Sequence, residues 1–254
     1  MSIITDPLFW ALAIPAFLIS GISKGGFASG AGNLAVPLTA LAIPAPQAAG
    51  IALPVLCAMD ISGLRAWWGK WSARELRAIL PGGLFGIGLG TAVFGLLSDR
   101  DVKLMVGLIA LVFLARSLWQ ARPGRTAPPP AEPNALRGGF WGAISGLTST
   151  IAHAGGPPLA VYLYPLRLDR QALAATTVVF FGVMNYVKLV PYFFLGQLTA
   201  QNLLTSLLLL PLAPIGVRIG VWLAKRISDR WFYRVVYVML GVSGVKLVAD
   251  GLGL

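Results

Sequence analysis

Lysines and one aspartate inside apolar stretches are the residues of this sequence whose types could do chemistry. Lys188 and Asp60 lie in runs that are long enough and apolar enough for a membrane, and Lys24 comes just after a shorter apolar run. An ionisable side chain at the centre of a membrane helix costs about 3 kcal/mol, so each is a functional candidate by default. Asn185 precedes Lys188 by one helical turn, so both side chains can face one cavity. This pattern predicts that an anion binds near the two lysines.

Two glycine-rich segments, 21–33 and 145–158, provide a second set of candidates. Glycine costs about 1 kcal/mol relative to alanine inside a helix, so this density predicts a broken helix. Non-helical backbone at membrane depth persists only where it is buried in protein or lines a cavity. The N-terminus of a half-helix offers N–H groups and partial positive charge to an anion. The candidate substrate ligands here are Lys24, Gly25, Gly26, Ser29, Gly30, Gly32, Asn33, Ser149, Thr150, His153, Gly155 and Gly156.

Each of these groups also has a structural alternative. Lys188 either contacts substrate, pairs with Asp60 or extends to the membrane interface. Asp60 either neutralises a nearby cation such as Arg65 or carries a coupling proton. His153 either serves substrate or a proton relay, or only hydrogen-bonds to backbone. Glycines in the two breaks could instead allow close helix packing, which we expect at positions 82/86/90, 138/142/146 and 216/220.

The elements that position these residues must be membrane helices. The 254 residues are 57% hydrophobic and 11% charged, whereas a soluble domain has about 25% charged residues. A helix needs about 20 apolar residues to cross the hydrocarbon. The long apolar runs are 47–64, 79–97, 102–118, 172–195, 203–224 and 231–248, and the shorter runs 8–22 and 138–152 lead into the glycine-rich segments. The sequence therefore predicts an all-α integral membrane protein.

Composition also excludes several classes of function. The lone Cys57 rules out a disulfide framework, and the single histidine, His153, gives no His-x3-His set, so we expect no metal. No phosphate-binding Gly-x4-Gly-Lys-Ser/Thr loop is present, and we expect no cofactor. The net charge of +11 comes from loop residues that set topology, so we expect no nucleic-acid partner. Asp6, with no basic residue before the first apolar run, argues against a cleaved signal peptide.

The chain repeats itself around a Pro-rich polar linker, residues 120–136. Segment 32–37 resembles 157–162, Met59-Asp60 is matched by Met184-Asn185, and the Gly/Ser-Asp-Arg pattern of 86–100 returns at 216–230. Three matches in the same order are typical of an internal repeat. We therefore predict a first transmembrane repeat at 1–119, a cytoplasmic linker at 120–136 and a second transmembrane repeat at 137–254.

The loop charges indicate that the two repeats are inverted. Loop 65–77 is basic, its counterpart 196–202 is uncharged, and 225–230 is basic instead. By the positive-inside rule the basic loops and the linker are cytoplasmic. An odd number of crossings per half follows, either about ten segments in all or three crossings per half with re-entrant hairpins, and both termini lie outside the cytoplasm. Eight continuous spans, the alternative, would make the repeats parallel.

The aromatic residues of the first basic loop have a simpler interpretation. Trp67, Trp68 and Trp71 adjoin Lys70 and Arg74. Tryptophan beside lysine and arginine is typical of the aromatic belt at a membrane interface. We therefore expect no substrate role for these three tryptophans.

At the level of family, the glycine-rich opening that ends in Asn33-x2-Val36-Pro37 and its weaker second copy are informative. Together with the polar linker and the length, they resemble the sulfite exporter TauE/SafE family of bacterial membrane proteins. The resemblance implies export or uptake of sulfite, sulfonates or other small sulfur-containing or organic anions. It also implies that substrate binds around 25–37 and 155–162. His153 and the Pro157-Pro158 pair depart from the first copy, so the half-sites should differ.

The function expected from these features is secondary transport of a small anion by alternating access, as a multi-pass protein of the bacterial inner (plasma) membrane. Sulfite, an organosulfonate or a related anion is the expected substrate, and the lipid bilayer is the other partner. An anion channel or uniporter is the alternative, and an intramembrane enzyme using His153 and Asp60 is a remote one, so we expect no enzyme activity. Proton or sodium coupling, with Asp60 as the candidate group, and homo-oligomerisation stay open.

Overall fold

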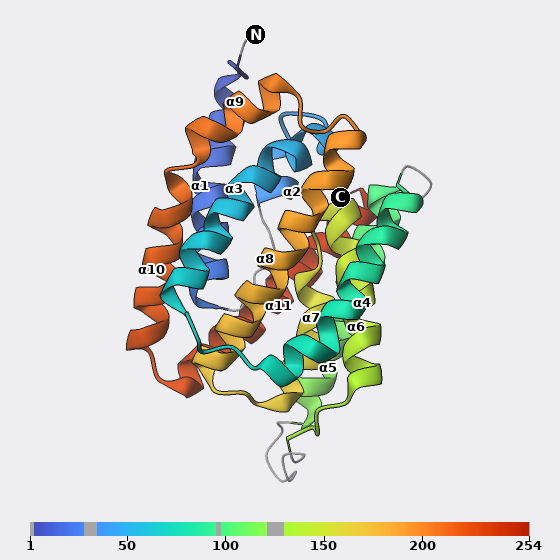
Figure 1. Ribbon diagram of the computed structural model, residues 1–254, viewed down its shortest axis with the longest axis vertical. Coiled ribbons are helices and arrows are strands. Elements are labelled where there is room, and N and C mark those ends of the chain that lie inside the picture. Colours follow the sequence, from blue (N-terminus) through green and yellow to red (C-terminus); the bar gives the residue numbers. More distant parts are fainter. Residues whose placement is uncertain (1–2, 28–34, 95–97, 121–129, 254) are drawn as a thin grey trace. The chain divides into compact units, whose positions relative to one another are not determined.

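The computed structural model describes residues 3–27, 35–94, 98–120 and 130–253 (Figure 1). Its regular structure in these ranges is helical, which confirms the predicted all-α class. The helices are α1 (Pro7–Gly26), α2 (Ala35–Thr39), α3 (Ala45–Ala66), α4 (Ala73–Ala92), α5 (Asp99–Gln120), α6 (Ala135–Ala152), α7 (Gly156–Leu163), α8 (Arg170–Phe194), α9 (Ala200–Leu209), α10 (Leu212–Arg226) and α11 (Asp229–Leu252), with a 3-10 turn at Tyr164–Leu166.

The helices form two compact units, and each unit combines helices from both halves of the sequence. One unit holds α1, α2, α3, α8, α9 and α10. The other holds α4, α5, α6, α7, the 3-10 turn and α11. The compact units therefore differ from the repeats predicted at 1–119 and 137–254, which stay a prediction about sequence and topology.

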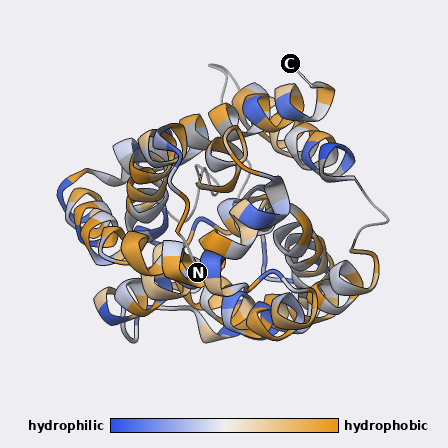
Figure 2. Ribbon diagram, turned by 90° about the horizontal axis from the view of Figure 1, so that it is seen from above, coloured by the Kyte–Doolittle hydropathy of each residue, from blue (hydrophilic) through white to orange (hydrophobic). Residues whose placement is uncertain are grey.

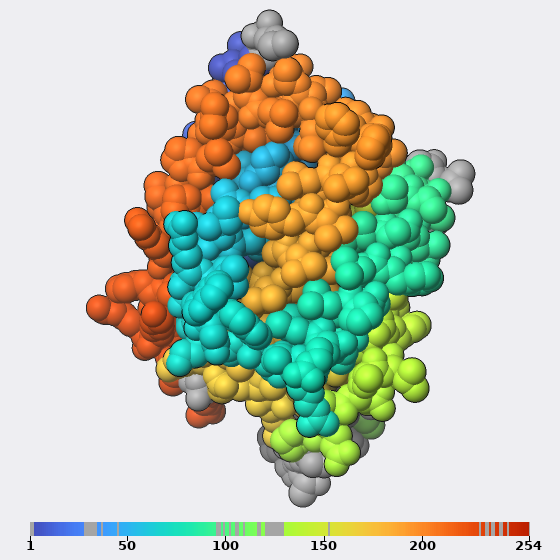
Figure 3. Space-filling model, viewed as in Figure 1, coloured from blue at the N-terminus to red at the C-terminus, as the bar shows by residue number. Residues whose placement is uncertain are grey.

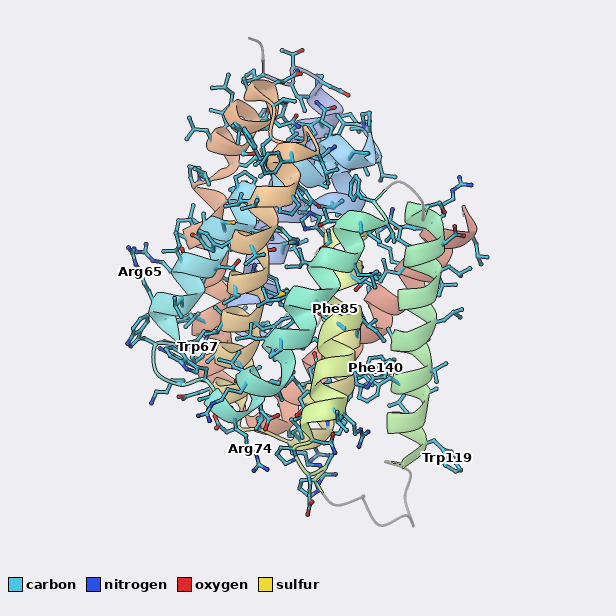
Figure 4. All side chains as sticks on the ribbon, turned by 45° about the vertical axis from the view of Figure 1, so that its right-hand side comes forward. Arg65, Trp67, Arg74, Phe85, Trp119 and Phe140 are labelled. Carbon is cyan, nitrogen blue, oxygen red and sulfur yellow. The ribbon has the colours of Figure 1, made fainter. Side chains whose placement is uncertain are left out.

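Three of the described helices are long and apolar enough to cross a membrane: Pro7–Gly26, Pro46–Ala66 and Arg170–Phe194. A fourth span results if α9 and α10, bent by 43°, are counted as one. Hydrophobic residues occur all along the helices (Figure 2). Large apolar side chains are exposed, among them Phe85 and Phe140 (Figure 4), as expected for helices that face lipid. The predicted number of about ten segments remains a prediction.

In the first unit, α1 and α10 pack closely through glycines. A Cβ atom on Gly25 would lie 2.6 Å from the carbonyl oxygen of Val217, and one on Gly26 would overlap the carbonyl of Gly220. Beside this pair, α3 and α8 lie next to each other (Figure 3). The close contact confirms the packing role predicted for the glycines at 216 and 220.

In the second unit, α4 and α6 pack in the same manner. A Cβ atom on Gly86 would overlap the carbonyl of Ala143, and one on Gly146 would overlap that of Gly83. The exposed Gly88, on the opposite side of α4, has open space around it. The two glycine-rich faces therefore serve helix contact, as predicted for 82/86/90 and 138/142/146.

Candidate functional site

The first predicted break begins where α1 ends. Asp6 caps the start of α1 by accepting a hydrogen bond from the Leu8 N–H (2.8 Å), and the helix ends at Gly26. Phe27 takes a non-helical conformation and donates its N–H to the Ser23 carbonyl (2.8 Å). The predicted ligands Ser29, Gly30, Gly32 and Asn33 lie outside the described residues.

A buried charge cluster lies at this end of α1. The Lys24 Nζ is 2.6 Å from Asp60 Oδ1 on α3, and Asn185 Nδ2 on α8 donates to Asp60 Oδ2 (2.7 Å). Lys24 also donates a long hydrogen bond to the Leu56 carbonyl (3.4 Å). These three polar side chains are almost fully buried. The structure thus brings together three predicted site residues, Lys24 and Asp60 from the first half of the sequence and Asn185 from the second half.

Lys188 belongs to the same cluster. It lies one turn after Asn185 on α8, its exposed fraction is 0%, and it interacts electrostatically with Lys24 and Asp60. Complete burial contradicts the alternative in which this ammonium extends to the interface. Two lysines and one carboxylate therefore share one buried region, a composition suited to holding an added negative charge.

Asp60 neutralises a nearby cation, as one of its two interpretations expected, but the cation is Lys24 and not Arg65. Arg65 is exposed and points away from α3 (Figure 4), while Asp60 is buried against Lys24. Five residues along a helix turn the direction of a side chain by about 140°, so the two groups cannot share a face. The carboxylate is paired through tertiary structure instead.

Trp67 takes part in this site, contrary to the prediction of a purely interfacial role. Its exposed fraction is 3%, against 69% for Trp68, and its Nε1 donates to the Gly25 carbonyl (2.7 Å). The Lys225 ammonium lies 5.6 Å from the centre of the Trp67 ring. Trp67 follows Asp60 by seven residues, two helical turns, and this spacing is the sequence signal that could have identified it.

The second predicted break lies in the other unit, and its segment, residues 145–158, contains no Asp, Glu, Lys or Arg. Helix α6 ends at Ala152, His153 adopts a left-handed conformation (φ 50°), and α7 begins at Gly156. The Ser145 hydroxyl donates to the Gly155 carbonyl (2.7 Å), and the Ala154 N–H donates to the Thr148 carbonyl (3.2 Å). The helix is therefore interrupted as predicted, and hydroxyl and backbone groups hold the turn.

Of the remaining candidates in this unit, Thr150 donates to the Gly146 carbonyl of its own helix (2.8 Å), and Ser149 and His153 are buried. Pro157 and Pro158 occupy the first turn of α7 and lack N–H groups. The amide donors at the start of α7 are therefore those of Gly155 and Gly156, fewer than the predicted stretch suggested. All five candidates of this break, Ser149, Thr150, His153, Gly155 and Gly156, lie in the second unit.

A buried carboxylate that the sequence places near a helix end also lies in the second unit. Glu75, in the first turn of α4, is 1% exposed, and the Tyr162 hydroxyl of α7 donates to its Oε2 (2.6 Å). The contact ties the half-helix after the break to α4. Only the tertiary arrangement brings these two residues together, so sequence reasoning missed the pair.

Residues 13–247 match the sequence model of the sulfite exporter TauE/SafE family. The chain belongs to this family. It is similar to "Probable inner membrane transporter protein TsaS" of Comamonas testosteroni, with 31% identity over 201 residues, which cover 78% of this chain and 80% of that protein. No solved structure matches the chain significantly. The predicted resemblance is confirmed, and this TauE/SafE member is a membrane transporter.

Proposed function

We propose that this TauE/SafE member is a secondary transporter of small anions in the inner membrane, and that Lys24 and Lys188 attract the anion. Sulfite, an organosulfonate or a related sulfur-containing or organic anion is the proposed substrate. The observation that carries the proposal is the burial of two lysines with one carboxylate in one unit. The name of the Comamonas testosteroni relative supports the inner membrane as the location.

Burial of the two lysines favours the binding of an anion. A buried charge is costly unless other charges and hydrogen bonds compensate for it. Asp60 offsets one positive charge of the cluster, and a bound anion would offset a second. The Trp67 indole donates to the carbonyl of Gly25, the residue after Lys24, and the Lys24 ammonium itself is held by Asp60. Small anions with several acceptor oxygens suit such a site.

The packing of the helices supports the inverted repeat that alternating access requires. If α1 corresponds to α6 and α4 to α10, the contact of α1 with α10 has its equivalent in the contact of α6 with α4. Asp60 and Asn185 are equivalent positions and are hydrogen-bonded directly to each other. Two equivalent residues touch when they lie near the axis that relates their helices, so we place the axis that relates α3 to α8, both in the first unit, at this contact.

The contact between Lys225 and the Trp67 ring supports the proposed topology. Lys225 belongs to the second basic loop and Trp67 to the first, and the two are in contact. Both loops therefore lie at the same end of this unit, as the positive-inside rule requires if both are cytoplasmic. We accordingly propose that the first basic loop, the second basic loop and the linker are cytoplasmic. In this proposal the broken helices are the moving parts of an alternating-access carrier, and the protein catalyses no chemical reaction.

Uptake by the purified protein in proteoliposomes tests the function. The wild-type protein should accumulate sulfite or methanesulfonate saturably and show counterflow, whereas single-channel currents would favour the anion channel. Lys188→Met should lower uptake by at least about tenfold, because a charged hydrogen-bond donor is lost. The matched control is Lys70→Met, which removes an exposed lysine of the same unit. A folded Lys188→Met protein with unchanged uptake would contradict the proposed site.

A further inference from the structure

Asp60 is an anion that Lys24 already holds. The ammonium lies 2.6 Å from Asp60 Oδ1, and both groups are buried. Its hydrogen bond to the Leu56 carbonyl, at 3.4 Å, is much longer. A substrate anion that reaches Lys24 must therefore share the ammonium with Asp60 or displace the carboxylate from it.

Asn185 can keep the Asp60 carboxylate in position when Lys24 binds a substrate anion. Its side-chain amide donates to Asp60 Oδ2 (2.7 Å) and brings no positive charge. Gly182, one turn before Asn185 on α8, lies against Asp60 and has no side chain, and a Cβ atom there would be in ordinary van der Waals contact with the Asp60 Cβ (3.6 Å). The carboxylate would remain beside the bound anion and repel it through surroundings that screen charge weakly.

We infer that Asp60 competes with the substrate for Lys24 and thereby restricts the site to monovalent anions. This inference rests on the proposed function and specifies its substrate class. Among the described residues of the cluster, Lys24 and Lys188 in their protonated forms bring two positive charges, and the Asp60 carboxylate brings one negative charge. A monovalent anion brings the sum of these charges to zero, whereas a divalent anion leaves a net negative charge buried beside a carboxylate.

Substitution of Asp60 by Asn removes the negative charge and keeps the size of the side chain. The probes are methanesulfonate, a monovalent anion, and sulfate, a divalent anion, in uptake by proteoliposomes. Wild-type protein should prefer methanesulfonate by at least about tenfold, and Asp60→Asn should raise sulfate uptake relative to methanesulfonate by a similar factor. The matched control is Asp250→Asn, which removes a carboxylate paired with Lys246 in the other unit and should leave the ratio unchanged.

The exchange Asp60→Asn with Asn185→Asp offers a second variant, which keeps both side-chain types in contact. The carboxylate stays in the cluster, so the preference for methanesulfonate should return. A double variant that selects sulfate as strongly as the single variant would overturn the inference.

The remaining outcomes separate the inference from the proposed function. Uptake of methanesulfonate with an unchanged ratio in Asp60→Asn overturns the inference alone. A wild-type protein that prefers sulfate also overturns it, even if neither variant folds. A wild-type protein that moves neither probe, nor sulfite, contradicts the proposed function, and the inference falls with it.

Discussion

The two helix breaks resemble each other in sequence and differ in how they are held. At the end of α1, a buried ion pair between Lys24 and Asp60 and an indole donor fix the chain. At the end of α6, hydroxyl groups and a residue with positive φ, His153, do so. The spacing of 125 residues between Asp60 and Asn185 also relates Lys24 to Ser149. One break therefore concentrates charge where its counterpart has a neutral hydroxyl.

This difference shows that equivalent glycine patterns specify an interruption and not its chemistry. Glycine lowers the preference for helix in both segments, but the side chains beside it decide what the interruption can bind. The charged break lies beside α3 and α8, which bring Asp60, Asn185 and Lys188. Under the proposed function, the first break would attract the anion, and the second break would not bind it through a charged side chain of its own.

The difference between the two helix breaks is tested most directly by removing one charge of the ion pair between Lys24 and Asp60. Lys24→Met leaves Asp60 buried without its cation, and this should lower the free energy of unfolding by about 3–5 kcal/mol. Adding Asp60→Asn should restore most of the stability. Ser149→Ala, at the equivalent position, should cost no more than about 1–3 kcal/mol. Thermal unfolding in detergent measures all three variants, and equal losses for Lys24→Met and Ser149→Ala would contradict the difference between the breaks.

The glycine contacts between helices are alike in the two units, so glycine substitutions should destabilise both units to a similar extent. Gly26→Ala and Gly86→Ala each place a methyl group against a carbonyl, so each should destabilise the protein by about 1–3 kcal/mol. Gly88→Ala, in open space on α4, is the control and should be neutral or stabilising by up to about 1 kcal/mol. The same unfolding measurement applies, and a Gly86→Ala protein as stable as Gly88→Ala would rule out the close contact.

Trp67 tests whether the end of α1 depends on its indole. Trp67→Phe loses the hydrogen bond to the Gly25 carbonyl and should cost about 0.5–1.5 kcal/mol. Uptake should fall as well, since Lys24 neighbours the freed carbonyl. Trp68→Phe, at an exposed position of the same loop, should change neither quantity. Identical uptake by the two variants would return Trp67 to a purely interfacial role.

The smallest effect on uptake is expected at His153. A left-handed conformation costs a residue with a Cβ atom about 1–2 kcal/mol, so His153→Gly should gain up to this amount, offset by the loss of side-chain packing. If the second break is only a neutral turn, uptake should remain near the wild-type level. A large fall in uptake by a stable His153→Gly protein would show that the imidazole serves substrate or proton, and the two breaks would be closer in function than in structure.

Sequence reasoning reached the class, the family, the end of α1 at the first predicted break, the second break and the members of the charge cluster. These features depend on local signals, namely apolar length, glycine density and charge inside an apolar run. Of the partners suggested for Asp60, Arg65 is wrong and Lys24 was not among them, because Arg65 is near in sequence and Lys24 is near only in the fold. The role of Glu75 and the composition of the compact units were hidden for the same reason. The Glu75–Tyr162 contact and the composition of the units join distant segments, which no local pattern encodes, whereas the seven-residue spacing from Asp60 was a local signal for the burial of Trp67.

The hydrogen bond between Asp60 and Asn185 has a consequence for how such a protein could have arisen. If the halves descend from one duplicated segment, this position once faced its own copy. Two aspartates there would have had to share a proton, and two asparagines would have left a lysine without a counter-charge. A pair of one acid and one amide can exist only after the two copies diverged. A single chain with two different halves can therefore form this contact, whereas two identical chains cannot.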